Sequence, residues 1–130
     1  MKSLNKVQLI GHLASDPELR TSETGVQVAT FPLAINRDWC CADGTRKDAV
    51  DYHRIIAFNR LADVCVQHLV KGSPVYVEGK LQNHSFDDKT GRKHYVTEIV
   101  LEHLDILIYK RTSVGIETNF ANVSDEKQIP

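Results

Sequence analysis

Residues 50–81 read VDYHRIIAFNRLADVCVQHLVKGSPVYVEGKL, and this stretch predicts a strand, a helix and a second strand in succession. Over 50–58 and again over 73–82, apolar and polar residues alternate with a period of two, which is typical of strands with one face toward a core. Between them the period becomes helical over about 60–70. One apolar stripe marks the buried side of that helix: Leu61, Val64, Cys65 and Leu69.

Both ends of this helix carry sequence signals. Asn59 is expected to be the N-cap, because its side chain can accept a hydrogen bond from a free backbone amide of the first turn. Gly72 is expected to stop the helix, because glycine readily adopts the left-handed conformation that follows a last turn.

Three further strands extend this unit in both directions. They are expected over 5–13, 26–36 and 92–109, and Gly11 inside the first of them predicts a bulge or a sharp bend. The order is then three strands, one helix and two strands. This order predicts an all-β chain with one small helix: the five-stranded Greek-key barrel of the OB-fold, with the helix between strands three and four.

Length and charge fit one domain followed by a short tail. The chain has 130 residues, 42% of them hydrophobic, and a formal net charge of −1, which is ordinary for a globular protein. We expect the barrel domain over 1–111, with 15 basic and 14 acidic residues. Residues 112–130 hold one basic and three acidic residues and lack periodicity, so a flexible, weakly acidic tail is expected there.

Composition also bears on location and on metals. No apolar run is long enough to span a bilayer, and the first residues lack the apolar core of a signal peptide, so a cytoplasmic location is expected. The three cysteines Cys40, Cys41 and Cys65 are read as free thiols. Adjacent cysteines do not have the spacing of zinc ligands, and we expect no metal and no cofactor.

Aromatic and basic side chains are interleaved along the chain. Four aromatic residues are candidates for stacking on bases: Trp39, Tyr52, Phe58 and Phe86. Arg54 lies between two of them, and other cations flank them: Arg37, Arg60, Lys80, Arg92 and Lys93. A protein that binds single strands without sequence preference needs both kinds of side chain, because every base has a face and every nucleotide a phosphate. The alternative is that the aromatic residues simply complete the barrel core.

Four blocks of the sequence resemble the bacterial single-stranded DNA-binding protein family. They are Asn5-Lys6-Val7-Gln8-Leu9-Ile10-Gly11-His12-Leu13, Asp16-Pro17-Glu18-Leu19-Arg20, Tyr52-His53-Arg54-Ile55-Ile56-Ala57-Phe58 and Lys71-Gly72-Ser73-Pro74-Val75-Tyr76-Val77-Glu78-Gly79-Lys80-Leu81. The blocks have the family's order and together cover about residues 5–109. The resemblance implies an OB-fold protein that is not an enzyme and that coats single-stranded DNA in replication, recombination and repair, near the nucleoid.

The resemblance also implies roles for particular residues. Trp39, Tyr52, Phe58 and Phe86 match the family's stacking positions. Five cations match its basic positions: Lys6, Arg20, Arg54, Arg60 and Lys71. His53 matches a position near subunit contacts, and family members usually form homotetramers.

The end of the chain departs from the family. Members often finish with an acidic run and Asp-Ile-Pro-Phe, which docks on replication and repair enzymes. Here the last residues are Ser124-Asp125-Glu126-Lys127-Gln128-Ile129-Pro130, without the final Phe and with an acidic run of only two residues, which Lys127 interrupts. We expect partner docking through this tail to be weak or absent.

Three other functions remain as alternatives. A nuclease could use Asp87, Asp88 and Asp38 to hold a divalent ion, although turn chemistry also explains the two adjacent aspartates. A redox or metal protein could use Cys40 and Cys41. An OB-fold interaction module of the primosome type could work mainly through protein contacts.

Overall fold

The structure is a computed structural model that describes the backbone of residues 1–112 and 115–124 and the side chains of residues 1–107. Within that part, seven strands and one helix follow one another along the chain. They are β1 (Val7–Leu13), β2 (Glu18–Thr21), β3 (Gln27–Cys40), β4 (Arg46–Phe58), α1 (Asn59–His68), β5 (Pro74–Asp87), β6 (Lys93–Thr112) and β7 (Gly115–Ser124).

Five of these strands close into a barrel. The hydrogen-bonded order is β1-β5-β6-β4-β3, and β1 also pairs with β3, which completes the circle. The neighbours are antiparallel except for β4 and β6, which run parallel where Ile55 lies opposite Ile99. With α1 between the third and fourth barrel strands, the OB-fold predicted from the strand order is confirmed.

Two close approaches between strands depend on glycine. A Cβ on Gly11 would lie 2.4 Å from the carbonyl oxygen of Ala34, where β1 passes from β5 to β3. A Cβ on Gly79 would lie 2.1 Å from the carbonyl oxygen of Val100. The register shifts at Gly79 in β5, whereas β1 stays in regular register with β5 through Gly11. β1 therefore has no bulge at Gly11. The missing side chain there instead lets β1 pass close to the backbone of β3.

The core lies inside the barrel and under α1. Phe31, Leu33 and Ile55 are almost fully buried, and Cys65 of α1 packs against them from the apolar stripe of the helix. Burial raises the pKa of the Cys65 thiol to about 12, because a thiolate is poorly solvated there. The predicted stripe therefore faces the core.

The ends of the helix differ from the sequence prediction. The N-cap is Phe58, and it makes no side-chain capping bond. Asn59 is instead the first helical residue and has a φ of 55°, a left-handed conformation that asparagine tolerates better than most residues. The helix ends at His68, and Leu69 is the C-cap. Asn59 as N-cap is thus wrong, because the chain turns sharply as it leaves β4.

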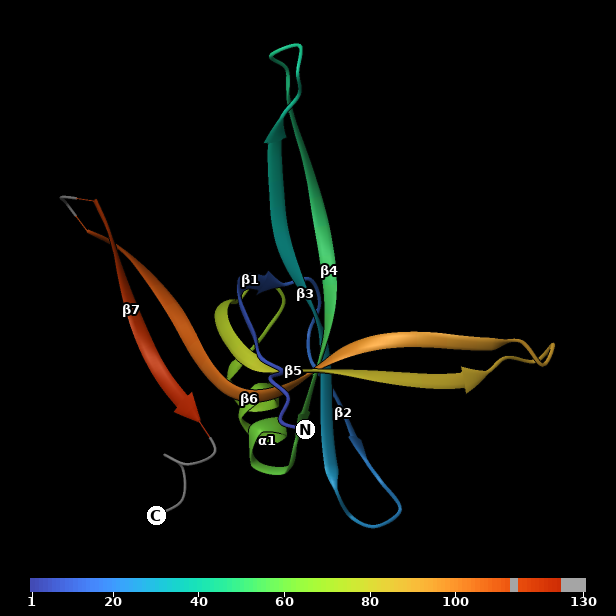
Figure 1. The fold of residues 1–130 in the computed structure, drawn as a ribbon. Helices are drawn as coiled ribbons and strands as arrows, with labels where there is room; N and C mark the ends of the chain where they lie inside the picture. The colour runs from blue at the N-terminus through green and yellow to red at the C-terminus, as the bar shows by residue number, and fades with distance from the viewer. Residues whose placement is uncertain (113–114, 125–130) are drawn as a thin grey trace.

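Strands β3, β4, β5 and β6 are longer than the sequence predicts, and the pairs β3–β4 and β5–β6 project from the barrel (Figure 1). We call residues 36–50 the β3–β4 arm and residues 82–98 the β5–β6 arm. Outside the barrel these strands meet no core, so the alternation that marks a half-buried strand is weak there. Beyond Thr112 the sequence predicts no strand, yet β7 pairs antiparallel with β6.

Candidate nucleic-acid interface

The outer face of β4 presents the predicted aromatic and basic side chains together. Tyr52, Arg54 and Phe58 alternate with the buried residues Ile55 and Ala57, so the first three leave the strand on its outer side. The four candidate stacking residues expose between 38% and 65% of their surface. Rings that served only to fill a core would be buried.

A groove continues this face from β4 onto the β5–β6 arm. It has a volume of about 430 Å³, and Phe58 and Phe86 both line it. The remaining lining residues are Arg54, Ile56, Gln82, His84, Val96 and Glu98. A second hollow of about 320 Å³ adjoins Tyr52, His53 and Arg54 on the side toward β2. Because Arg54 lines both hollows, the structure brings Tyr52, Phe58 and Phe86 onto one surface, which we call the groove face.

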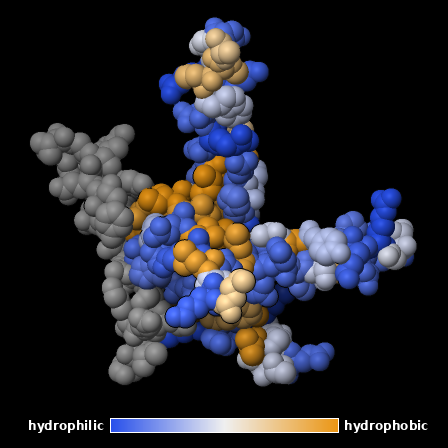
Figure 2. Space-filling model, viewed as in Figure 1, coloured by the Kyte–Doolittle hydropathy of each residue, from blue (hydrophilic) through white to orange (hydrophobic). Residues whose placement is uncertain are grey.

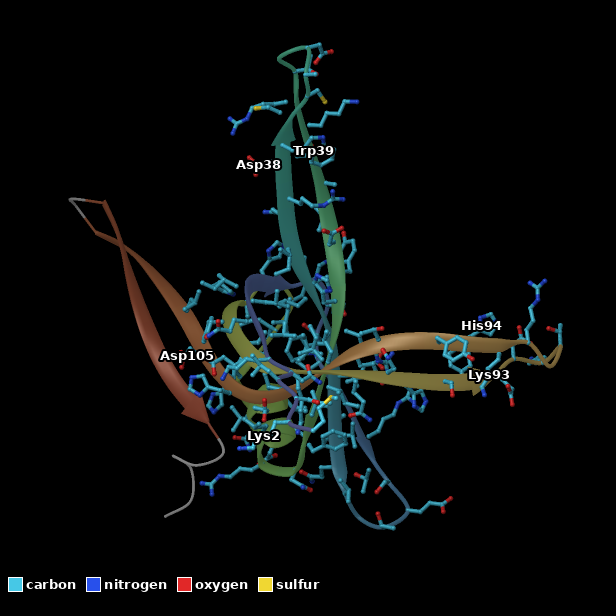
Figure 3. All side chains as sticks on the ribbon, viewed as in Figure 1. Lys2, Asp38, Trp39, Lys93, His94 and Asp105 are labelled. Atoms are coloured by element: carbon cyan, nitrogen blue, oxygen red, sulfur yellow. The ribbon has the colours of Figure 1, made fainter. Side chains whose placement is uncertain are left out.

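Trp39 lies on a different face. It is opposite Lys47 in the β3–β4 arm, whereas Tyr52 is opposite Ala34. Odd and even positions of a regular strand point to opposite sides. Trp39, labelled on the β3–β4 arm in Figure 3, therefore leaves this ladder on the face opposite to that of Tyr52. The structure therefore does not place all four rings on one side of the sheet.

Carboxylates hold several of the predicted phosphate-binding cations. Arg54 Nε is 2.7 Å from Glu98 Oε2, and the Glu98 side chain is only 13% exposed. Arg37 pairs with Asp51 at 3.0 Å, and Lys6 pairs with Glu78 at 3.0 Å. Arg20 lies 4.0 Å from Glu18, with both side chains well exposed. Phosphates that reach these cations compete with carboxylates already in place.

The other cations lie at scattered places. Lys80 is opposite Val100 on the strand face that also carries Phe86. Lys93 is opposite Asp87, which places it on the other face of the β5–β6 arm. Arg92 is in the turn at the tip of that arm, Arg60 is in α1, and Lys71 follows α1. Among the residues whose side chains are described, no ion pair is found at Lys71, Lys80, Arg92 or Lys93.

Phe86 has a ring partner that the sequence did not indicate. The ring of His94 stacks on it, with centroids 5.3 Å apart and planes 20° apart. His94 Nε2 is 2.6 Å from Asp88 Oδ2. Hydrogen bonds from Thr90 and His94 lower the pKa of Asp88 to about 2. Asp88 therefore organises the turn of this arm, as turn chemistry predicts.

Sequence reasoning missed three exposed side chains of the β5–β6 arm. His84 and Gln82 line the groove beside Phe86. Tyr95 is 73% exposed on the opposite face of the arm, across from Ser85. The period of two in this segment could have placed all three, once the strand was known to reach Asp87.

His53 lies on the inner side of β4, opposite Leu33, and is half-buried. The outer side of β1 carries a separate polar network. Gln8 Nε2 donates to the Tyr76 hydroxyl at 3.0 Å, and Tyr76 donates to Glu78. Hydrogen bonds from Tyr76 and Lys6 lower the pKa of Glu78 to about 2. Ile10 of β1 is exposed beside this network.

The described residues also bear on metal binding and on membrane insertion. Within the described residues, His, Cys, Asp and Glu side chains nowhere gather in a group of three or more that could hold a metal ion. Over the same part of the chain, no helix has the length and apolar character needed to cross a membrane.

Comparisons with known proteins assign most of this chain to one family of sequences. The profile of the single-strand binding protein family matches residues 4–107. "Single-stranded DNA-binding protein 1" of Chlorobaculum tepidum is 45% identical over 115 residues, which are 88% of this chain and 71% of that protein. "Single-stranded DNA-binding protein" of Bacteroides thetaiotaomicron is 39% identical over 115 residues, or 87% of this chain and 71% of the relative.

A solved structure is similar as well. The Plasmodium falciparum SSB complex with ssDNA superposes with a TM-score of 0.72 at 30% sequence identity. The match covers 93% of this chain and 97% of that chain. The likeness therefore includes nearly the whole fold.

Proposed function

The chain belongs to the single-strand binding protein family, and from this premise we propose that it coats single-stranded DNA without sequence preference. In that role it protects transient single strands during replication, recombination and repair. The observation that carries the proposal is the groove face, where Tyr52, Phe58 and Phe86 are exposed around Arg54. Duplex DNA hides its base faces, so such rings favour single strands.

Binding combines stacking with charge neutralisation. Bases stack on Tyr52, Phe58 and Phe86 along the groove face and on Trp39 across the β3–β4 arm. Each stacked base contributes about 1–3 kcal/mol. Phosphates are neutralised by cations near these rings and at other places on the surface: Lys6, Arg20, Arg54, Arg60, Lys71, Lys80, Arg92 and Lys93.

The lone tryptophan tests the proposal directly. The protein is titrated with oligo(dT), and separately with a duplex of equal length, while Trp39 emission is followed at low and moderate salt. We expect quenching by the single strand only, and weaker quenching as salt rises. Absence of binding in this titration and in an independent anisotropy assay would contradict the proposed function.

The protein acts in this role by binding alone, without catalysis and without a cofactor. Its place is the cytoplasm, at the nucleoid, where single strands arise. Mg²⁺-dependent cleavage of a labelled single strand would contradict the non-catalytic role.

Assembly extends the track for DNA. We propose a homotetramer with His53 near subunit contacts and with the outer side of β1, where Ile10 is exposed, packed against another copy. Sedimentation should then give about four times the chain mass of 14.7 kDa. A mass of one chain at micromolar concentration would exclude the tetramer.

The docking of partner proteins by the tail is proposed to be weak or absent. The residues concerned, 125–130, lie outside the described residues. The acidic run of only two residues, which Lys127 interrupts, motivates this proposal. A micromolar complex with a repair helicase that is lost on deletion of 125–130 would contradict it.

One observation favours the alternative of a protein-interaction module. Arg54, Arg37 and Lys6 already have carboxylate partners, which leaves less positive charge for phosphates. Replacing Trp39 and Phe58 with Ala separates the two functions. Loss of activity in cells favours DNA stacking, whereas full activity favours protein contacts.

A further inference from the structure

Two of the four stacking rings lie on the arms, and each has another side chain against one of its faces. Arg37 Cζ lies over the Trp39 ring, 4.9 Å from its centroid. The His94 ring lies parallel to Phe86 at 5.3 Å. Each ring therefore has one face covered from within its own arm. The other face is the one on which a base could stack.

A carboxylate in turn fixes each covering side chain. Arg37 Nε donates to Asp51 Oδ2 at 3.0 Å. His94 Nε2 lies 2.6 Å from Asp88 Oδ2. Asp88 is itself held by the Thr90 hydroxyl at 2.6 Å and by the Arg92 amide at 2.9 Å, both at Oδ1. On each arm the contacts thus run from a carboxylate to a covering side chain and then to a ring, and on the β5–β6 arm the carboxylate is itself held in place.

We propose that His94 and Arg37 are positioning residues, each of which holds one stacking ring in place by covering its rear face. The proposal rests on the proposed function and adds residues to the same binding surface. An arm outside the barrel gives a ring no core to pack against, so an unsupported ring would lose rotamer freedom when a base binds. A ring that is already held avoids that cost. For Arg37, whose charge Asp51 already satisfies, this role replaces the phosphate contact expected from the sequence.

A double-mutant cycle on the β5–β6 arm tests the proposal. Affinity for a labelled oligo(dT) is measured by anisotropy for the wild type, His94→Ala, Phe86→Ala and the double variant. His94→Ala should weaken binding by about 2-fold to 12-fold, the range that an aromatic contact supplies. In the Phe86→Ala background it should weaken binding no further, because the ring that it positions is gone. Equal losses in both backgrounds would overturn the proposal.

Further variants distinguish ring stacking from hydrogen bonding and from a general loss of folding. His94→Phe keeps a ring against Phe86 and should retain affinity, whereas His94→Gln should lose it. This pair decides the question even if His94→Ala unfolds, and loss in both variants would overturn the role of ring stacking. His68→Ala, which removes an exposed imidazole from α1, is the matched control and should bind as the wild type does.

The β3–β4 arm gives a second, independent readout. Arg37→Gln should weaken binding in the wild type but not in the Trp39→Ala background. It should also leave the salt dependence unchanged. A direct phosphate contact would instead reduce the slope of log K against log[salt] by about 0.7, and that result would overturn the positioning role of Arg37.

The outcomes distinguish this proposal from the proposed function. If the wild type does not bind oligo(dT), the proposed function fails. If the wild type binds, and the affinity losses of the ring variant and of the covering-residue variant simply add in the double variant, only the positioning roles fail.

Discussion

Arg54 lies at the centre of the groove face, yet it faces Glu98 at 2.7 Å. A phosphate that binds Arg54 must compete with this carboxylate, and the carboxylate also repels the phosphate. The residue that sequence reasoning places between two stacking rings is therefore present but partly neutralised. Its contribution to binding depends on a neighbour 44 positions later in the chain.

Replacing Glu98 with Gln should tighten binding of single-stranded DNA. The change frees the Arg54 guanidinium and removes a negative charge from the groove. The slope of log K against log[salt] should become steeper by up to about 0.7, as expected for one more phosphate contact. Affinity is measured for wild type and Glu98→Gln at four salt concentrations, with Glu23→Gln in an exposed turn as control. Weaker binding by Glu98→Gln would show that Glu98 orients Arg54 rather than competing for it.

The cysteines should differ sharply in reactivity. Cys65 is buried and its thiol pKa is raised to about 12, so almost no thiolate is present at pH 8. Cys40 is exposed at the end of β3. A disulfide reagent at pH 8 should modify Cys40 quickly and Cys65 only after denaturation, as peptide mass mapping would reveal. Rapid modification of Cys65 in the folded protein would contradict the position of α1.

At the scale of elements, the pairing of β1 with β5 helps to close the barrel, and its outer surface carries a polar network. Glu78 on β5 receives hydrogen bonds from Tyr76 and Lys6, and these lower its pKa from 4.5 to about 2. The folded state therefore favours the charged carboxylate. That stabilisation is present above about pH 4.5 and is lost as the pH falls toward 2.

Glu78→Gln should make the free energy of unfolding fall less steeply as the pH is lowered. Between pH 5 and about 2, wild type loses the contribution of the Glu78 carboxylate, whereas the amide has no charge to lose. Urea midpoints are measured for both proteins at intervals across this window. Parallel profiles would mean that Glu78 titrates with its ordinary pKa. Because Asp88 titrates in the same window with a pKa of about 2, Asp88→Asn serves as the comparison variant.

Gly79→Ala should destabilise the barrel. Its Cβ would lie 2.1 Å from the Val100 carbonyl oxygen, so β5 and β6 must separate locally. Overpacking of this kind costs about 1–3 kcal/mol. Urea unfolding of Gly79→Ala and of Ser85→Ala, an exposed position on the same strand, measures the difference. Unchanged stability of Gly79→Ala would contradict the close approach of β5 to β6 at the register shift.

At the scale of the whole molecule, the chain binds its ligand without a large net charge. A formal charge of −1 provides little long-range attraction to a polyanion. Attraction must come from local cations on the groove face and on the arms. Figure 2 shows that the β3–β4 and β5–β6 arms are mostly hydrophilic, whereas hydrophobic residues gather over the barrel.

Affinity for oligo(dT) should fall with salt by a log–log slope of about −0.7 for each phosphate neutralised. The slope should stay modest, because several cations are already paired. Titrations with oligo(dT) from 50 to 500 mM salt, on the order of the range in which counterion release is measured, give the number of contacts. An affinity that does not change with salt would contradict phosphate neutralisation.

Much of the fold follows from the sequence because its signals are local. Alternation over 50–58 predicts β4 and its outer face, and the stripe through Leu61 and Cys65 predicts which side of α1 is buried. The same alternation places Tyr52 and Phe58 on one side of β4, but only the structure shows that this side is exposed. The helix start at Asn59 is not predicted correctly, because the direction of the chain as it leaves β4 sets that turn.

What the sequence by itself determined is the order of the five barrel strands along the chain and the buried side of the helix, since these depend on the period of apolar residues along the chain. Only the tertiary structure decided which rings share a face. The register of β3 and β4 puts Trp39 and Tyr52 on opposite faces. The pairing of β4 with β6 brings Glu98 to Arg54. The pairing of β5 with β6 brings His94 to Phe86. Contacts between residues distant in sequence leave no periodic signal in either strand, so they emerge only when the barrel closes.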